Sequence, residues 1–165
     1  MAAVEFALIL PAMIALIFGA VEVTSALICK ADVSNTASTA ADLIAQESQV
    51  NTTDFNNVFS ALGSLIYPFP STSIKVVITS VIDDGHGGGK VDWSKTYHGT
   101  ARSKGSAVAV PAGLLTTGGS VVLSEVTYTY TPLSNVLVRL PITMNDTFYS
   151  HPRRVAQIKC TDCGS

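Results

Sequence analysis

Charged side chains are scarce in this sequence. Only 13% of its 165 residues are Asp, Glu, Lys or Arg, and the 10 basic residues nearly balance the 12 acidic ones. Proteins that bind nucleic acid need a basic surface, because the phosphate backbone is recognised through Lys and Arg. The sequence has neither a basic excess nor a basic stripe interleaved with aromatic residues. Nucleic acid is therefore excluded as a partner.

Catalytic motifs are also missing. The stretch "HGGGK" (86–90) is similar to the oxyanion-hole loop of some lipases, but the G-x-S-x-G turn that would carry the nucleophile does not occur. The three histidines have no zinc-ligand spacing, and Asp83-Asp84-Gly85 lacks the later ligands of a calcium loop. We therefore predict a protein that is not an enzyme, without catalytic residues, metal or cofactor. The glycine-rich residues 84–89 are interpreted as the loop of a hairpin.

Cysteines are few, and two of the three form "CTDC" near the C terminus. A redox-active C-x-x-C opens a helix within a βαβ unit, and a zinc ribbon needs a second pair, but the sequence indicates neither. In an exported domain, a Cys160–Cys163 disulfide is the default prediction, with intermolecular pairing or free thiols as alternatives. So small a ring contributes only about 2 kcal/mol, enough to fasten the tail. Cys29 is interpreted as a small apolar residue.

A long apolar run dominates the N-terminal part. From Phe6 to Cys29 only Glu22 is charged, and as a helix this run would measure about 36 Å, enough to cross a bilayer with some tilt. We predict that residues 6–29 are transmembrane. The alternative is a secretory signal cleaved near Thr24-Ser25-Ala26, although the basic region that precedes the apolar run of a signal is not found here. Pro11 and many small residues suit close packing against other helices.

The helical pattern continues beyond this run. Apolar and mostly small residues recur at helical spacing on one face, at Val33, Ala37, Ala40, Ala41 and Ile44. The sequence thus predicts one long helix over residues 1–48, apolar all round in its first half and amphipathic in its second. Residues 49–165 are predicted to form an extracytoplasmic α+β domain in which an antiparallel sheet packs on this helix.

A second helix is predicted over Asp54–Leu65. Its apolar stripe consists of Phe55, Val58, Phe59, Leu62 and Leu65. Thr53 or Asp54 can cap its N terminus, and "YPFP" (67–70) ends it.

Strands are predicted in the remainder of the chain. Alternating patterns cover residues 73–83, 90–101, 120–132 and 141–150, with a further short edge strand at 155–160. In the second of these strands, Val91, Trp93 and Tyr97 should point to one face of a half-buried sheet. Residues 105–119 carry no pattern that assigns a conformation.

Glu5 stands directly before sixteen uncharged residues, Phe6 to Val21. A charged acid at mid-bilayer costs on the order of 3 kcal/mol, so it lies at the interface or has a partner. One interpretation is an inert position among headgroups. The other is an ion pair with a free α-amine, which in a helical assembly would belong to the next subunit. For Glu22 the two corresponding interpretations are a pairing with a neighbouring subunit and a position near the outer headgroups.

The N-terminal part of the sequence resembles the TadE-like proteins. The features that carry the resemblance are the segment "AAVEFALILP" (2–11), the apolar helix after it, the acid at Glu22 and the amphipathic continuation. The TadE-like proteins are minor pilins, or pseudopilins, of the tight adherence (Tad) branch of type IV pili. In that family a prepilin peptidase removes a short basic leader, which leaves glutamate at the fifth position followed by phenylalanine. Glu5 and Phe6 occupy those places. The resemblance implies that Met1 is the first mature residue.

The resemblance also implies a pilin-like fold and a structural role in a pilus that serves functions such as cell adhesion. The subunit would be held in the bacterial inner membrane with its C-terminal domain outside the cytoplasm, and would reach the cell surface when assembled. Its implied partners are other pilin subunits, the prepilin peptidase and the pilus assembly platform. Met1, Glu5 and Phe6 would act in processing and assembly, and Glu22 in helix packing.

An alternative function is a membrane-anchored binding or adhesin module that acts alone. It would need an exposed pocket or aromatic cluster on the sheet, for which the candidates are Trp93, Tyr97, Tyr128 and Tyr130. Such side chains are more typical of a core or of cross-strand pairs.

Overall fold

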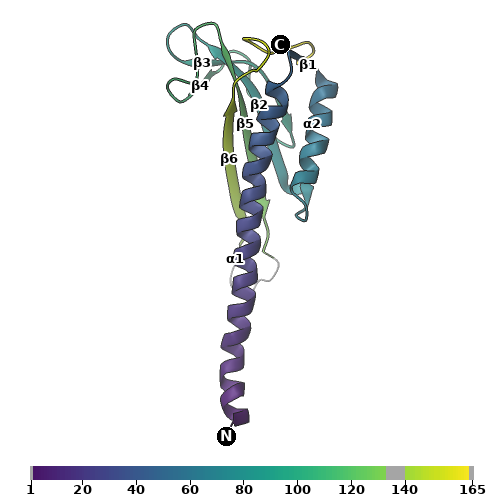
Figure 1. Ribbon diagram of the computed structural model, residues 1–165, viewed down its shortest axis with the longest axis vertical. Coiled ribbons are helices and arrows are strands. Elements are labelled where there is room, and N and C mark those ends of the chain that lie inside the picture. Colours follow the sequence, from purple (N-terminus) through teal and green to yellow (C-terminus); the bar gives the residue numbers. More distant parts are fainter. Residues whose placement is uncertain (1, 133–139, 164–165) are drawn as a thin grey trace.

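The computed structural model describes residues 2–132 and 140–163. Helix α1 (Ala2–Ala45) is one continuous α-helix of 44 residues, as its pattern predicted. Its C-terminal half lies along a sheet domain, and its N-terminal half projects from that domain as a single rod (Figure 1). The α+β class and the antiparallel sheet packed on a long helix are confirmed.

The main sheet has five antiparallel strands in the order β4-β3-β2-β5-β6. Strands β2 (Ile74–Asp83), β3 (Gly89–Tyr97), β5 (Ser120–Tyr130) and β6 (Ile142–Ser150) correspond to the four predicted strands. Strands β2 and β3 form the predicted hairpin. The short edge strand β4 (Ala107–Val108) lies in the segment to which no conformation could be assigned.

A second, two-stranded sheet joins distant parts of the chain. Strand β1 (Gln49–Val50) follows α1 and pairs in parallel with β7 (Lys159–Cys160). The predicted edge strand at 155–160 is therefore shorter, and it pairs with β1 instead of the main sheet. Nothing in the pattern of residues 49–50 indicates a strand, because a two-residue strand depends on its partner and has no periodicity of its own.

Helix α2 (Thr52–Leu65) begins earlier than predicted, and its cap is Asn51. The Asn51 side chain accepts a hydrogen bond from the backbone N–H of Asp54, whose carboxylate in turn accepts one from the Asn51 N–H. This reciprocal pair satisfies two donors at the helix N terminus. The prediction of Thr53 or Asp54 as cap was wrong. Leu65 also departs from its predicted place in the buried stripe, because the helix ends there and the following Ile66 points inward.

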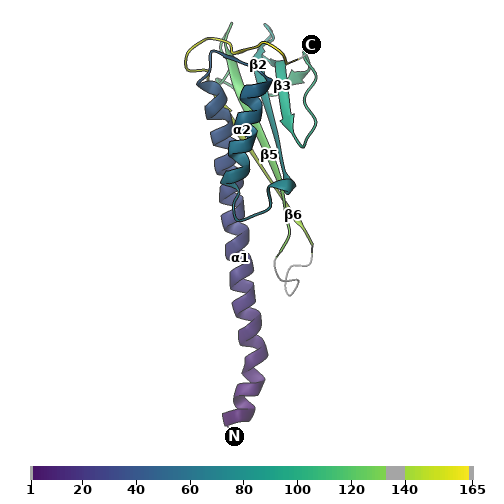
Figure 2. The ribbon, with the colours of Figure 1, turned by 90° about the vertical axis from the view of Figure 1, so that its right-hand side faces the viewer.

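The core lies between the two helices and one face of the sheet. Figure 2 shows α1 and α2 side by side on the same face. Three alanines of α1, Ala37, Ala40 and Ala41, are at most 1% exposed. Their small side chains allow the helix backbone to approach the sheet closely, and larger residues from α2 and the strands fill the space beside it. The short 3-10 helix η1 (Ser71–Ser73) leads from α2 into β2.

A bulge in β3 changes which face Val91 occupies. Ser80 pairs with Trp93 and Val81 with Val91, so Asp92 is an extra residue in β3. Val91 consequently points away from Trp93 and packs in a separate cluster on the opposite face of the sheet. The prediction that Val91 shares a face with Trp93 and Tyr97 was wrong, because one inserted residue inverts the two-residue alternation.

The alanine face of α1 gives the first testable prediction. Ala40→Leu should lower the free energy of unfolding by about 1–3 kcal/mol, because added methylene groups push the helix away from the sheet. Denaturant unfolding of the full chain in detergent, followed by the fluorescence of the buried Trp93, measures this change. Ala31→Leu is the matched control, since Ala31 is exposed on the same helix. Equal midpoints for the two variants would contradict a close contact at Ala40.

Candidate functional site

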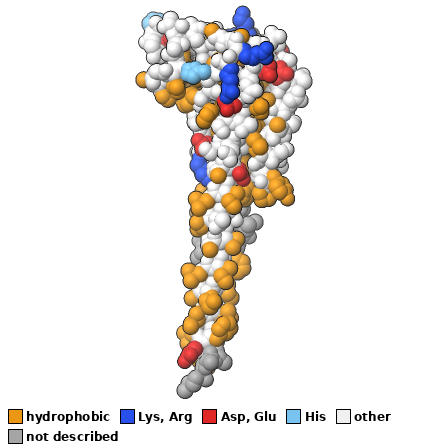
Figure 3. Space-filling model, in the orientation of Figure 1, with side chains coloured by type: hydrophobic (Ala, Val, Ile, Leu, Met, Phe, Trp, Pro, Cys, Tyr) orange, Lys and Arg blue, Asp and Glu red, His pale blue; other side chains and the backbone are white. Residues whose placement is uncertain are grey.

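The N-terminal half of α1 is an uncovered apolar helix. From Val4 to Val21 no side chain is buried, and Phe6 is 59% exposed. By length and composition α1 can cross a membrane, and the sheet domain covers none of its most apolar window, whose mean hydropathy is 2.4. Figure 3 shows apolar side chains along the whole visible face of this half, including both of its edges. At 1.5 Å per residue, Val4–Val21 measures about 27 Å, close to the thickness of a hydrocarbon core.

Glu5 lies in the first turn of this helix and its side chain is exposed. A carboxylate there faces the positive end of the helix dipole, which favours the charge locally. Glu5 lies about 26 Å along the helix axis from Glu22, the first described side chain of α1 that is buried. Of the three residues predicted to act in processing and assembly, Met1 lies outside the described residues.

Glu22 is the first buried side chain among those described in α1, with 4% of its surface exposed. It lines an apolar pocket of about 300 Å³ together with Tyr130 and Met144. Burial raises the pKa of the Tyr130 phenol, and the nearby Glu22 carboxylate acts in the same direction. Glu22 is thus covered by the sheet domain of its own chain. The predicted span 6–29 overlaps this covered part, which also includes the fully buried Cys29.

An ion pair holds α1 to the edge strand of the sheet just beyond this point. The Lys30 ammonium donates to the Asp146 carboxylate at 2.9 Å and to the Asn145 carbonyl at 2.8 Å. The hydrogen bond from Lys30 is the main reason that the pKa of Asp146 lies below its ordinary value. Nearer the end of α1, Asp42 accepts from Ser150 and Arg153. These contacts fix the helix to β6 and to the segment after it.

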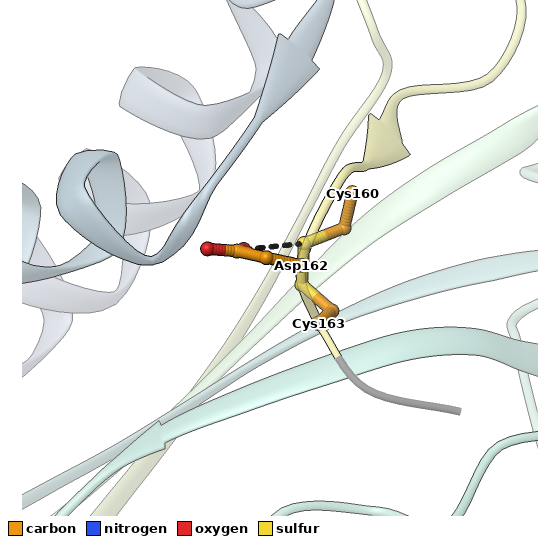
Figure 4. A group of neighbouring side chains, drawn as sticks. All are labelled: Cys160, Asp162 and Cys163. Atoms are coloured by element: carbon orange, nitrogen blue, oxygen red, sulfur yellow. Dashed lines mark hydrogen bonds between the residues drawn. A yellow bond between two sulfur atoms is a disulfide. The ribbon is translucent and has the colours of Figure 1, made fainter.

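The predicted cysteine pair lies at the far end of the molecule. Cys160 and Cys163 are joined by a disulfide, with Asp162 between them (Figure 4). The Asp162 carboxylate accepts from the backbone N–H of Thr52, the first residue of α2, and this bond lowers the pKa of Asp162. The indole N–H of Trp93 donates to the Ile158 carbonyl at 2.7 Å. The C-terminal segment is therefore tied both to the start of α2 and to the core.

Cys160, Asp162 and Cys163 bring three potential metal ligands within 4.8 Å of one another. Both sulfur atoms are committed to the disulfide, so this group can offer thiolates only after reduction. In the β2–β3 loop, the Asp84 carboxylate accepts from the backbone N–H groups of His86 and Gly88, which lowers the pKa of Asp84. These bonds brace a hairpin loop in which Gly85 and Gly87 adopt positive φ values, a conformation that favours glycine.

The aromatic candidates for a binding cluster lie mostly inside the core. Trp93, Tyr128 and Tyr130 are 2–4% exposed, and Tyr97 is partly buried against Phe59. They supply no exposed aromatic surface on the sheet.

The candidate residues thus fall into two separate groups. Glu5 and Phe6 lie near the free end of α1, whereas the Cys160–Cys163 disulfide lies at the opposite end of the sheet domain (Figures 1 and 4). Glu22 marks the junction between the free and the covered halves of α1. Sequence reasoning missed the Lys30–Asp146 pair, because its partners are 116 residues apart and belong to elements whose relative register no local pattern reveals.

Comparison with known proteins adds one finding. The model of a family described as TadE-like protein matches residues 1–42, which is the segment that carries the resemblance seen in the sequence. No curated protein matches this chain, and no solved structure matches it. The match therefore covers most of α1 and does not extend into the sheet domain.

The Lys30–Asp146 pair gives a prediction about pH. Because the pKa of Asp146 is depressed in the folded protein, its contribution to stability is present above the ordinary carboxyl pKa of 3.8 and is lost as pH falls through the folded value. Asp146→Asn should therefore lower the free energy of unfolding at pH 7 by up to about 1 kcal/mol, since the pair is partly exposed, and by less at pH 3.

Denaturant titrations of the full chain in detergent at several pH values measure this difference. Lys30→Gln should remove the same pH-dependent part, and the double variant should add little to either single change. A penalty for Asp146→Asn that stays constant down to pH 2 would contradict the assignment.

Proposed function

We propose that this protein is a pilin-like structural subunit of a Tad-type pilus, held in the inner membrane by the N-terminal half of α1 and assembled through the same helix. The observation that carries this proposal is the uncovered apolar segment Val4–Val21, with a carboxylate at its beginning, on a helix whose other half is built into a folded domain. The TadE-like match over residues 1–42 links that segment to proteins of the Tad system.

An uncovered apolar rod of this length needs a non-aqueous environment. Soluble proteins rarely expose contiguous apolar patches larger than a few hundred Å², and this helix is apolar on all sides. Two environments fit it: the hydrocarbon core of a bilayer and a bundle of similar helices. A pilin occupies these two in turn, first stored in the membrane and then packed in the filament.

The surface of the segment suits close helix packing. Small residues recur along it, at Ala7, Ala12, Ala15, Gly19 and Ala20, and they let neighbouring backbones approach each other. Among such helices a buried carboxylate needs a cation. The α-amine of a neighbouring subunit would supply it for Glu5, and the pair would set the axial register between subunits.

In this proposal the sheet domain faces outward and takes part in no catalysis. The Cys160–Cys163 disulfide suits an oxidising compartment outside the cytoplasm. The prepilin peptidase acts on the cytoplasmic side and leaves Met1 as the first mature residue, whose free α-amine is then available to a neighbouring Glu5.

The processing step can be tested by the mass and N-terminal sequence of the protein isolated from its native cells. The proposal expects a mature chain that begins at Met1, after a basic leader encoded upstream has been removed. An unprocessed initiator at Met1 would refute the processing step. A chain that begins near Leu27 would refute the entire pilin proposal, because the apolar segment would then be a cleaved signal.

The role of Glu5 is tested by Glu5→Ala. The variant should remain in the membrane fraction, because removing a charge does not weaken an apolar span, but it should lose pilus assembly since the register pair is absent. Cell fractionation and electron microscopy of surface filaments measure the two properties. Glu47→Ala is the matched control, as Glu47 is an exposed acid beyond the other end of α1. Normal filaments in the Glu5→Ala strain would contradict the register role.

A further inference from the structure

Two surface segments of the sheet domain expose large apolar side chains. Directly after the buried stripe of α2, Leu65 is 42% and Tyr67 82% exposed. Two residues before β6, Leu140 is 76% exposed, and Ile142, the first residue of β6, is 38% exposed. Both segments lie at the end of the domain from which the free half of α1 projects (Figures 1 and 2). Soluble surfaces do carry scattered apolar residues, and Phe148, in the later part of β6 and 39% exposed, is one of them. The other four are gathered at one end of the domain, beside an apolar rod.

Pocket linings place these segments against a defined part of α1. On one side of the helix, Phe69 and Pro70, which follow Tyr67, line a pocket with Ser25 and Ile28. On another side, Ile142 lines the pocket that contains Val23 and Leu27. The exposed apolar residues thus lie close to the level of residues 22–28, immediately after the free segment ends at Val21.

This level coincides with the headgroup layer of a membrane that α1 spans. If Val4–Val21 fills the hydrocarbon core, residues 22–28 lie about 2–10 Å beyond its edge. The polar layer on each side of a bilayer is about 5–8 Å thick, from the difference between its total and hydrocarbon thickness. Tyrosine is enriched in that layer, where its ring meets the acyl chains and its hydroxyl meets water.

Charge at this level fits the same environment. Lys30 lies about 14 Å beyond the edge of the hydrocarbon core, one to one and a half helical turns past the polar layer. Its side chain is 45% exposed even though it pairs with Asp146. A long basic side chain in this position can keep its aliphatic part near apolar surface while its ammonium faces the polar region.

The arrangement around the helix favours a lipid surface over a single neighbouring copy. Successive residues of a helix are 100° apart, so Ser25 and Ile28 lie on the opposite flank of α1 from Val23 and Leu27, with the domain-facing Glu22 and Ala26 between them. The helix of a second copy can fill the pocket on one flank. A bilayer surrounds the helix and meets both flanks at the same level.

We propose that this end of the sheet domain rests in the headgroup layer of the membrane that anchors α1, with Leu65 and Tyr67 inserted on one flank of the helix and Leu140 and Ile142 on the other. The inference rests on the proposed membrane anchoring. With the helix and two flanking segments held at one surface, the domain stands upright on the membrane. When a subunit leaves the bilayer for a filament, these four side chains leave lipid together with α1.

Site-specific fluorescence on the full chain tests the proposal. Single cysteines introduced by Tyr67→Cys and Leu140→Cys carry a nitrobenzoxadiazole label, in a Cys29→Ala background that leaves only the disulfide-bonded native pair. The protein is reconstituted into phosphatidylcholine–phosphatidylglycerol vesicles that contain nitroxide lipids labelled either at the headgroup or deep in the acyl chain. Leu16→Cys reports on the span, and His86→Cys, in the exposed β2–β3 loop, is the control outside the membrane.

The expected result is that headgroup nitroxides quench the Tyr67 and Leu140 labels about twofold or more relative to the His86 label, while acyl-chain nitroxides quench the Leu16 label. If the Leu16 label is quenched and the other two behave like His86, the inference is overturned and membrane anchoring stands. If the Leu16 label is not quenched, both proposals fail. Quenching at only one of the two flanks also overturns the inference. Disulfide cross-linking between copies of the unlabelled cysteine variant at the other flank, after addition of a thiol oxidant, would then assign that flank to an interface between subunits.

Discussion

The continuity of α1 across two environments is the constraint on which the rest of the structure depends. Helical backbone runs from Ala2 to Ala45, with one donor missing from its hydrogen-bond ladder at Pro11. The helix is apolar all round before Glu22 and amphipathic after it. The apolar surface of the first half is unfavourable in water, and its own domain does not cover it. The apolar face of the second half is buried by that domain. Because the helix is unbroken, the position of the sheet domain and the position of the apolar segment are mechanically coupled.

The domain is built to hold the helix firmly. Alanines on the buried face bring α1 close to the sheet, and ion pairs from Lys30 and Asp42 reach the edge strand and the segment after it. The C-terminal segment then closes the far end, where Asp162 meets the start of α2 and Trp93 bonds to Ile158. Force applied to the free half of α1 would therefore be distributed over both helices and the sheet, a property that suits a subunit drawn into a filament by its N-terminal helix.

Local patterns predicted much of this molecule, and their failures have specific causes. The long helix, the second helix and four strands were confirmed because each has an extended periodicity of its own. The orientation of Val91 was wrong because the bulge at Asp92 is visible only in the pairing with β2. The cap of α2 was wrong by a few residues, since several polar side chains precede that helix and only the reciprocal bonds of Asn51 and Asp54 decide among them.

By itself, the sequence determined the apolar character and length of the N-terminal segment, the acid at Glu5, the resemblance over residues 2 to about 45, and the types of the main elements. These properties follow from composition and spacing along a single stretch of chain. The tertiary structure alone decided that the burial of α1 begins at Glu22, that Lys30 pairs with Asp146, and that β7 pairs with β1. It also decided that exposed apolar residues from two distant segments lie at the same end of the domain, on either side of α1. Each of these depends on the register between elements far apart in the chain, which packing and strand pairing establish and no local period encodes.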